Sequence, residues 1–228
     1  GITEHHNAVD NVLALINLAL LTGHVGRYGS GLAPLRGQNN VQGGGDMGAL
    51  PNRLVGFQDP LDPVVKARFE AAWNVKLPDH LGWNVTQMFH AMERGDLVGL
   101  YVIGENPAQS EADQNRTERL LAGLEHLVVQ DIFLTRTARL ADVVLPAAAA
   151  WCESDGTVTN SERRVQRVRA ALTPPGNARD DLWIITQIAR RLGLDWPDPD
   201  PEAVWNEVRV MAPHMFGGMS YRRLEELG

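Results

Sequence analysis

The feature that most constrains the fold is a set of short apolar segments separated by one amphipathic stretch. Residues 97–103 (LVGLYVI), 126–132 (HLVVQDI) and 142–145 (DVVL) each have the pattern of a buried strand. Short continuous apolar strands that alternate with a helix predict a parallel sheet covered on both faces. A right-handed crossover is the default connection between such strands. The sequence therefore predicts an α/β fold with a Rossmann-like parallel sheet.

Helical periodicity and glycine content organise the rest of the chain. Residues 8–21 are apolar on most faces, which predicts a buried helix. Residues 23–48 hold nine of the 22 glycines, which predicts an irregular loop whose backbone comes close to another group. A helix over residues 110–123 is expected to open with a capping box from Ser110 to Asp113. Further helices are expected at residues 63–73, 84–92, 180–192, 202–211 and 221–227, and exposed β structure at residues 156–169.

The turn GENPAQS, after the first predicted strand, leads into a helix N-terminus. Free N–H groups and the helix dipole favour an anion there, with Gly104, Asn106 and Ser110 as its natural contacts. The second strand ends at Gln130 and Asp131, where a carboxylate can accept hydrogen bonds from a ribose. Together these features suggest a nucleotide site, and an ordinary βα turn with a capped helix is the open alternative. No GxGxxG fingerprint follows either of these predicted strands, and the phosphate-binding P-loop is missing from the sequence.

A lone arginine lies inside the glycine-rich segment. Arg36 is followed by Gly37 and by the amides Gln38, Asn39 and Asn40. A cation and amides among glycines suit a small carboxylate or phosphate held by a fork of donors. A solvated surface arginine in a flexible loop is the alternative, and the pattern alone does not decide between them.

Composition excludes several classes of site. A formal net charge of −7 argues against a nucleic-acid binder with a basic surface. The single cysteine, Cys152, excludes a disulfide framework and a multi-thiolate metal site, and it is expected to be a small buried apolar residue. His5 and His6 are adjacent, so they do not converge on one ion, and no metal ligand is predicted within the chain. No apolar run reaches the length of a membrane span.

Four segments resemble the molybdopterin oxidoreductase superfamily across essentially the whole chain. They are PLRGQNNVQGGGDMGALP (34–51), GENPAQS (104–110), VVQDIFLTRTARLADVVLP (128–146) and GTVTNSERRVQ (156–166). Within that superfamily, GITEHHNAVDNVLAL and PLRGQNNVQG are similar to the catalytic alpha subunits of formate dehydrogenases. Related nitrate reductases carry GQPN where this chain has GQNN.

The resemblance implies a molybdenum or tungsten ion held by two pyranopterin guanine dinucleotides. It also implies that formate is oxidised to carbon dioxide by transfer of a hydride equivalent to the metal centre. Arg36 matches the arginine that orients the substrate carboxylate, and Gln38 lies beside it. Five positions match contacts to one dinucleotide: Asn106, Ser110, Gln130, Asp131 and Thr135. Gly104 is added to these cofactor contacts because of its place in the turn. Asp181 matches an acidic residue that binds guanine. A carboxylate can accept hydrogen bonds from the ring N–H and the exocyclic amine of guanine at the same time.

The resemblance also implies that this chain is a central piece of a larger protein. It begins Gly-Ile-Thr without an initiator methionine. The family's metal-ligating cysteine or selenocysteine and the cysteines of its [4Fe–4S] cluster are expected upstream of Gly1, and a cap domain beyond Gly228. The isolated piece is therefore expected to be inactive, and electron-transfer subunits or an acceptor protein are expected partners. A cytoplasmic location is expected, with a periplasmic one left open.

Family domains are interleaved, which implies a division of this chain into three parts. Residues 1–36 would finish one α/β domain. Residues 37–150 and 179–200 would form the dinucleotide-binding α/β domain, and residues 151–178 and 201–228 would belong to a smaller domain near the cluster. Two alternatives stay open. One is a molybdopterin oxidoreductase directed at an aldehyde or at nitrate, and the other is a nucleotide-binding or assembly module without redox chemistry.

Overall fold

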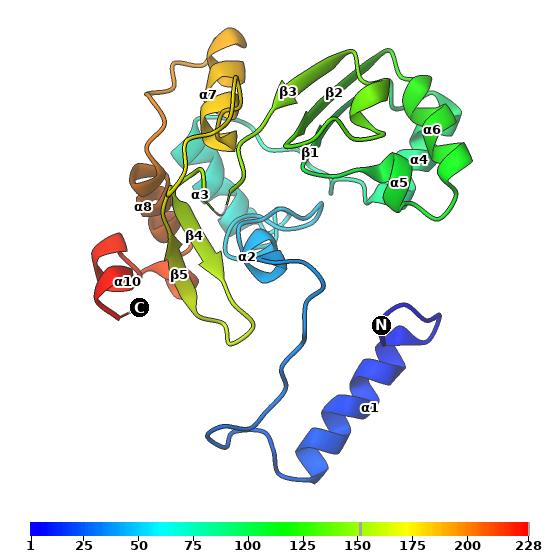
Figure 1. Ribbon diagram of the computed structural model, residues 1–228. Helices are drawn as coiled ribbons and strands as arrows, with labels where there is room; N and C mark the ends of the chain where they lie inside the picture. Colours follow the sequence, from blue (N-terminus) through cyan, green and yellow to red (C-terminus); the bar gives the residue numbers. More distant parts are fainter. Residues whose placement is uncertain (151, 228) are drawn as a thin grey trace.

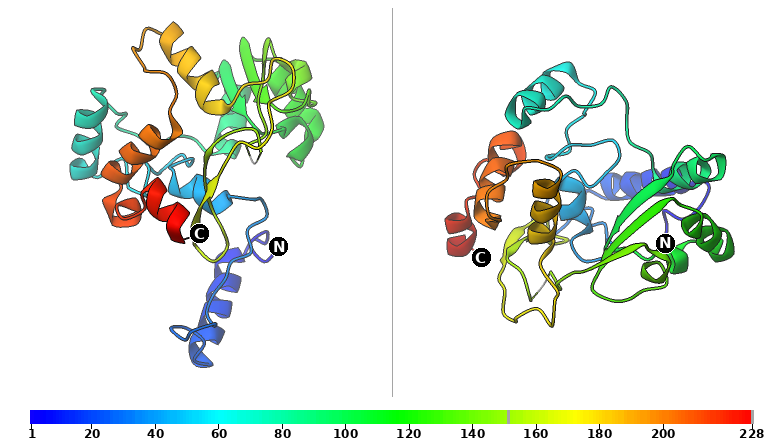
Figure 2. Two further views of the ribbon diagram at one scale, coloured as in Figure 1. Left: turned by 60° about the vertical axis from the view of Figure 1, so that its left-hand side comes forward. Right: turned by 90° about the horizontal axis from the view of Figure 1, so that it is seen from above.

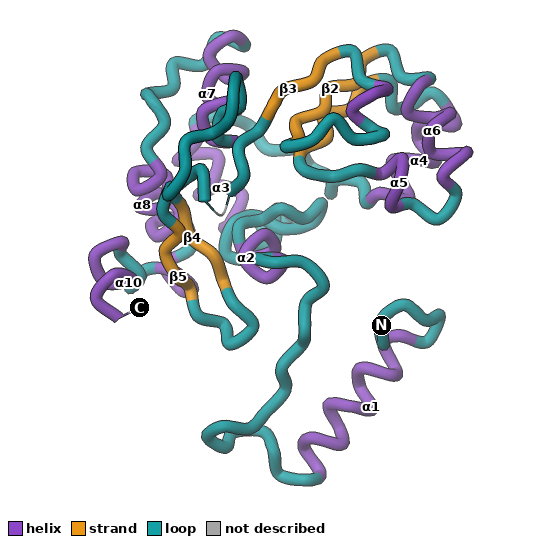
Figure 3. Tube along the Cα trace, viewed as in Figure 1, coloured by secondary structure: helices purple, strands orange, loops and turns teal. Residues whose placement is uncertain are grey.

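The computed structural model describes residues 1–150 and 152–227 (Figure 1). Helices and loops make up most of the trace, with strands in two separate places (Figure 3). The elements follow in the order α1 (Ala8–Leu21), α2 (Val41–Asp46), α3 (Pro63–Trp73), α4 (Val85–Arg94), β1 (Gly99–Ile103), α5 (Pro107–Ser110), α6 (Gln114–Ala122), β2 (His126–Asp131), η1 (Ala138–Leu140), β3 (Val143–Pro146), β4 (Gly156–Thr159), β5 (Val165–Val168), α7 (Asp181–Arg191), α8 (Pro201–Met211), α9 (Pro213–Phe216) and α10 (Tyr221–Leu227).

The three predicted strands form one parallel sheet in the order β1-β2-β3. Val102 of β1 lies opposite Val129 of β2, and Val129 lies opposite Val144 of β3. The chain passes from β1 to β2 through α5 and α6, which lie together on one side of the sheet (Figure 1). The predicted α/β architecture with a parallel sheet is confirmed.

One face of this sheet is packed and the other is largely open within the described residues. Val102, Leu127 and Val129 are buried against apolar side chains of α5, α6 and η1. On the opposite face Tyr101 is 39% exposed and Ile103 is 45% exposed. The prediction that both faces are covered is therefore wrong for this part of the chain, because the side chains of Tyr101 and Ile103 stay exposed.

The segment before α7 extends the sheet. Arg179 forms an isolated parallel bridge with Ala147. Its N–H donates to the carbonyl of Pro146 at 3.1 Å, and the N–H of Ala148 donates to its carbonyl at 2.8 Å. This pairing brings the N-terminus of α7, two residues later, to the carboxyl ends of the parallel strands (Figure 2).

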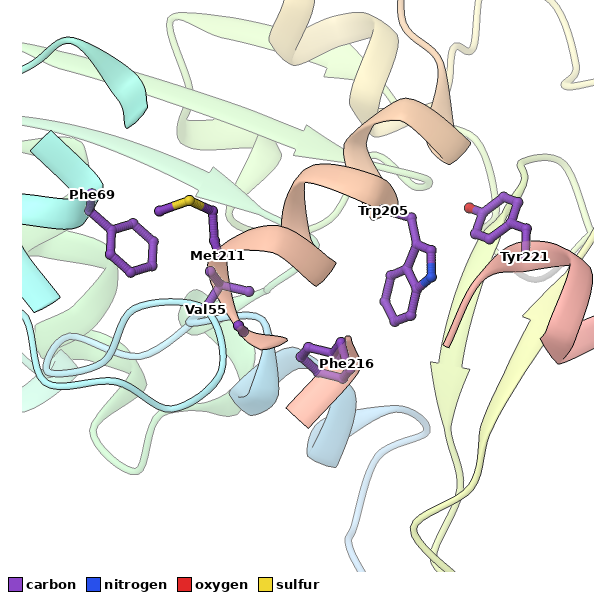
Figure 4. Close-up of a cluster of buried hydrophobic side chains, with 7 residues drawn as sticks. Val55, Phe69, Trp205, Met211, Phe216 and Tyr221 are labelled. Carbon is purple, nitrogen blue, oxygen red and sulfur yellow. The ribbon is translucent and has the colours of Figure 1, made fainter. Parts of the chain in front are cut away.

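A second hydrophobic core joins segments that are far apart in the sequence (Figure 4). Val55 and Phe69 pack with a C-terminal group around Trp205. The rings of Trp205 and Phe216 lie 5.2 Å apart between centroids. The indole N–H of Trp205 donates to the carbonyl of Met219 at 2.5 Å. This core therefore fixes the loop around Val55 to helices α8 to α10.

The glycine-rich segment contains a helix, which corrects the prediction of an entirely irregular loop. Helix α2 begins after Asn40, which has φ 58°. The backbone of Gly43 lies so close to the Asn40 side chain that an added Cβ would overlap it. The same Asn40 accepts a hydrogen bond from the N–H of Thr159 at 2.9 Å. Because Gly43 has no side chain, its backbone can lie against the Asn40 side chain within a short helix. The glycines here permit this packing and do not prevent helix formation.

Strands β4 and β5 form an antiparallel hairpin, as the alternating pattern predicts. They are half-buried rather than exposed, and Thr159 is buried. The physical reason is that α2 packs against β4 and α10 packs against β5.

Helix α1 has the predicted bounds but not the predicted burial. None of its residues is buried, and Leu21 is 86% exposed. The helix lies apart from the rest of the chain, joined to it by an extended segment (Figures 1 and 2). Its apolar sides therefore have no covering element in the described residues. None of the described helices is both long and apolar enough to cross a membrane.

The stretch predicted as one helix over residues 110–123 is divided. Ser110 ends α5, and Asp113 caps α6 by accepting a hydrogen bond from the N–H of Arg116 at 3.0 Å. The predicted capping box at Ser110 is wrong because Pro107 starts an earlier turn, for which proline is well suited at the first position.

This correction predicts different effects for two neighbouring substitutions. Asp113→Ala removes the α6 cap and should lower the free energy of unfolding by about 1 kcal/mol. Ser110→Ala should change it by less than about 0.5 kcal/mol, because Ser110 is exposed and caps no helix. Urea denaturation measures both. A larger loss in Ser110→Ala than in Asp113→Ala would contradict the observed helix start.

Candidate functional site

The carboxyl edge of the parallel sheet carries a chain of three polar side chains. Gln130, near the end of β2, is completely buried. Its Nε2 donates to Oδ1 of Asp181, the first residue of α7, at 2.5 Å. Its Oε1 accepts a hydrogen bond from the hydroxyl of Tyr101 on β1. Strands β1 and β2 and helix α7 are therefore joined by one group of hydrogen-bonded side chains. The group forms because the N-terminus of α7 lies against the sheet edge.

The direction of these hydrogen bonds is dictated by the carboxylate. An ionised carboxylate can only accept, so Gln130 must turn its amino group toward Asp181 and its carbonyl toward Tyr101. Loss of hydration against the sheet edge raises the pKa of the Asp181 carboxyl, the Gln130 hydrogen bond opposes this, and the charge of Asp180 adds to it. Burial, with the Asp181 charge, raises the pKa of the Tyr101 hydroxyl. Oδ2 of Asp181 has no hydrogen bond to any described residue, so it is free to accept from a ligand.

The turn after β1 is held by its own side chains. Oδ1 of Asn106 accepts from the N–H and the hydroxyl of Thr137, at 3.1 Å and 2.8 Å. Thr137 is buried and accepts from the N–H of Ala108 at 3.0 Å. Ser110 is exposed and donates to Glu105 at 2.9 Å. Asn106 thus shapes the turn, while the hydroxyl of Ser110 lies at the surface.

Gly104, at the start of the same turn, has no side chain to cover the backbone. Its φ is +63°, which favours glycine, and an added Cβ would meet no heavy atom within 4 Å. Its N–H donates to the carbonyl of Gln130 at 2.8 Å, so the turn and the buried amide are directly joined. A ligand can therefore approach the main chain closely here.

Two further predicted residues lie at the end of β2 and shortly after it. Asp131 accepts from the N–H of Phe133 at 3.3 Å, and Thr135 accepts from the N–H of Ala138 at 3.1 Å. Both are half-buried and both shape the loop between β2 and η1. The structure therefore gathers the predicted nucleotide residues around one edge of the sheet.

Arg36 and Gln38 belong to a different hollow. A pocket of about 240 Å³ lies between the segment that enters α2 and the turn after β4. Its lining includes Arg36, Gln38, Thr159 and Asn160. Nη2 of Arg36 donates to Oε1 of Gln42 at 3.2 Å. The arginine is thus exposed but is restrained by a neighbour on α2.

Sequence reasoning missed four residues that support the predicted ones. Tyr101 and Thr137 hold Gln130 and Asn106, as described above. Gln42 and Asp46 support Arg36, and their i,i+4 spacing on a helix was a usable signal that the glycine content concealed. Cys152 is half-buried and so only partly matches its expected burial. Within residues 1–150 and 152–227, no group of three or more potential metal-ligating side chains converges.

The parallel sheet and its polar carboxyl edge place the chain among the open-sheet α/β proteins, which bind ligands at that edge. The sequence profile of the molybdopterin oxidoreductase family matches residues 1–191. The chain belongs to this family. Acetylene hydratase from Pelobacter acetylenicus is structurally similar, with a TM-score of 0.50 and 26% identity over 62% of this chain and 20% of that one.

Curated relatives share much higher identity. The F420-dependent formate dehydrogenase alpha subunit of Methanocaldococcus jannaschii is 46% identical over 227 residues, which is 99% of this chain and 33% of the relative. Formate dehydrogenase H of Escherichia coli is 38% identical over 229 residues, covering 100% of this chain and 32% of the relative. The chain thus spans about a third of the length of these relatives.

The hydrogen-bonded group at the sheet edge predicts a set of pKa changes. The Asp181 carboxyl should titrate above its usual 3.8, higher still in Gln130→Met, which cannot donate, and lower in Asp180→Asn. Since the folded pKa is raised, the folded chain holds more protons, and the unfolding free energy falls as pH rises from 3.8 through the raised value. Carbon-13 NMR titration measures this, and an Asp181 pKa below 3.8 would contradict it.

Proposed function

We propose that the chain is a section of a formate dehydrogenase catalytic subunit that uses a molybdenum or tungsten bis-molybdopterin guanine dinucleotide. The observation that carries this proposal is Arg36, held by Gln42 at the mouth of a small pocket beside Gln38. Two relatives named formate dehydrogenase are 46% and 38% identical to this chain over 99% and 100% of its length, which includes the segment around Arg36. A nitrate- or aldehyde-directed member of the family is the alternative.

Arg36 suits formate because of its geometry and charge. Its planar guanidinium can donate two parallel hydrogen bonds to a carboxylate, which a lysine cannot do. Nε and Nη1 have no partner among the described residues, so donors remain for a ligand. We assign Arg36 to hold the formate carboxylate in one plane, and Gln38 to supply a further polar contact.

The residues at the sheet edge fit a guanine dinucleotide. Asp181 has an oxygen without a partner in the described chain, and a carboxylate can accept from two adjacent N–H groups of guanine. Gly104 gives a bare backbone suited to close approach by a pyrophosphate. When bound, the cofactor supplies the acceptor for the hydride equivalent lost by formate as it becomes carbon dioxide.

The remaining predicted contacts divide by accessibility. Ser110 is exposed and is assigned a direct contact, whereas Gln130 is buried and acts through Asp181. Asn106 is assigned the shape of the turn around Gly104. Asp131 and Thr135 are assigned to the loop that borders the same dinucleotide.

The proposal extends to parts of the protein outside this chain. A [4Fe–4S] cluster and an electron-acceptor protein or subunit would carry electrons away after formate oxidation. Residues 37–150 and 179–200 would form the dinucleotide-binding Rossmann-like domain. Residues 1–36 would complete a preceding domain, and residues 151–178 and 201–228 would lie nearer the cluster.

The substrate role of Arg36 predicts the effect of a conservative change. In the full-length enzyme, Arg36→Lys should lower kcat/KM for formate about 100-fold, since a charged hydrogen bond contributes about 1.5–3 kcal/mol. Bound metal should be unchanged, because Arg36 is assigned to substrate rather than to cofactor. Steady-state kinetics and metal analysis measure both quantities. Near-normal kinetics in Arg36→Lys would overturn the assignment.

The guanine role of Asp181 predicts a different loss. Asp181→Ala should lower the guanine released per chain when the purified full-length enzyme is denatured, together with its metal content. Asp180→Asn is the matched control, because asparagine can also cap α7 through the N–H of Trp183. Unchanged guanine and metal in Asp181→Ala would refute the assignment.

A further inference from the structure

Behind Arg36 lies a second chain of polar side chains, which ends at a buried carboxylate. Nη2 of Arg36 donates to Oε1 of Gln42 at 3.2 Å. Nε2 of Gln42 donates to Oδ1 of Asp46 at 2.9 Å. Asp46 is only 8% exposed, whereas Arg36 is at the surface. The three residues therefore run from the interior to the mouth of the pocket.

Asp46 sets the direction of both hydrogen bonds. Its carboxylate can only accept, so Gln42 must present its amino group inward and its carbonyl outward. The outward carbonyl can then accept from a guanidinium, which can only donate. A reversed amide would place two acceptors together at Asp46 and two donors together at Arg36. The observed arrangement is the one that satisfies all three groups.

The base of this chain is firmly held. Gln42 and Asp46 lie one turn apart on α2, and the carbonyl of Asp46 accepts from the N–H of Gly56 at 2.7 Å. Gly56 adjoins Val55, which belongs to the hydrophobic core around Trp205. At the other end of α2, Asn40 is bonded to Thr159 of the hairpin. Helix α2, which carries the buried carboxylate, is thus fixed both to the hydrophobic core around Trp205 and to the hairpin.

We propose that Asp46 and Gln42 are positioning residues that fix the guanidinium of Arg36 for a planar, carboxylate-sized anion. This inference rests on the proposed function for the identity of the anion as formate. A long exposed arginine loses about 1.5–2 kcal/mol of side-chain entropy when it is immobilised. Restraint through Gln42 meets part of that cost before the anion binds, which strengthens binding without any contact between Gln42 and the anion.

The test uses four variants of the full-length enzyme. Gln42→Met keeps an unbranched side chain but removes the amide. Gln42→Glu places two carboxylates in contact. The double variant Gln42→Glu with Asp46→Asn restores both hydrogen bonds in the same direction. The introduced asparagine can donate to the introduced glutamate, and the glutamate can accept from Arg36. Gln187→Met is the matched control, since Gln187 also lies on a helix and contacts an arginine, Arg191.

Anion binding, steady-state kinetics and cofactor content are measured on each variant. Calorimetry gives the Kd for nitrate, a planar anion that needs no turnover to be detected, and steady-state kinetics give KM and kcat for formate. Gln42→Met and Gln42→Glu should each raise the nitrate Kd and the formate KM about tenfold. The double variant should return both to within about threefold of the wild type, and Gln187→Met should change neither. Metal and guanine content should be the same in all.

Three outcomes overturn the inference. They are wild-type nitrate affinity in Gln42→Met, a double variant no better than Gln42→Glu, or an equal loss in Gln187→Met. If either single variant loses its cofactor or fails to fold, the double variant decides: once folded and loaded with cofactor it should bind nitrate within about threefold of the wild type, and a nitrate Kd raised about tenfold there overturns the inference. A wild-type enzyme that does not oxidise formate refutes the proposed function instead, and the nitrate data still test the positioning of Arg36.

Discussion

Gln130 is a completely buried amide that joins three elements which are separate in the sequence. It lies on β2, accepts from Tyr101 of β1 and donates to Asp181 of α7. Leaving a buried amide without partners costs about 1–3 kcal/mol, so α7 and the sheet are held in one relative position. The backbone pairing of Arg179 with Ala147, just beyond β3, also holds α7 against the sheet. The position of the Asp181 carboxylate, and with it the candidate nucleotide site, depends on this interaction.

The same arrangement recurs at the pocket around Arg36, with the opposite polarity toward the ligand. At the sheet edge the carboxylate of Asp181 faces outward and the glutamine lies behind it. On α2 the carboxylate of Asp46 is buried. It accepts from Gln42, which in turn accepts from the exposed guanidinium of Arg36. One site thus presents acceptors and the other presents donors. This difference suits the proposed pair of ligands, a guanine base and a carboxylate substrate.

Local signals were sufficient to predict the elements with strong periodicity and clear ends. Asn84 and Gln87 form the reciprocal cap that starts α4, and Gly95 ends it with a positive φ. The three strands also fall where short apolar runs predict them. Two local signals predicted the wrong element. Gly43 lies in a helix, where the Asn40 side chain occupies the space that a Cβ would need, and Pro107 starts a turn that divides the next helix.

Burial was predicted less well than secondary structure, for a related reason. Periodicity reports that helix α1 and both faces of the sheet are apolar, but it does not report which segment covers them. The candidate site shows the same division. Gln130, Asp181 and Arg36 were predicted from position and resemblance. Tyr101, Thr137, Gln42 and Asp46 were not, because their roles are hydrogen bonds that exist only after the chain has folded.

We propose that Asp181 at the sheet edge recognises guanine. The most direct test is calorimetric binding of GMP and AMP to full-length protein produced without cofactor. Guanine offers two adjacent donors to a carboxylate, whereas adenine places a lone pair at the corresponding ring nitrogen. We expect GMP to bind at least about tenfold more tightly than AMP, and Asp181→Ala to abolish the difference. Equal affinities for the two nucleotides in the wild-type protein would contradict it.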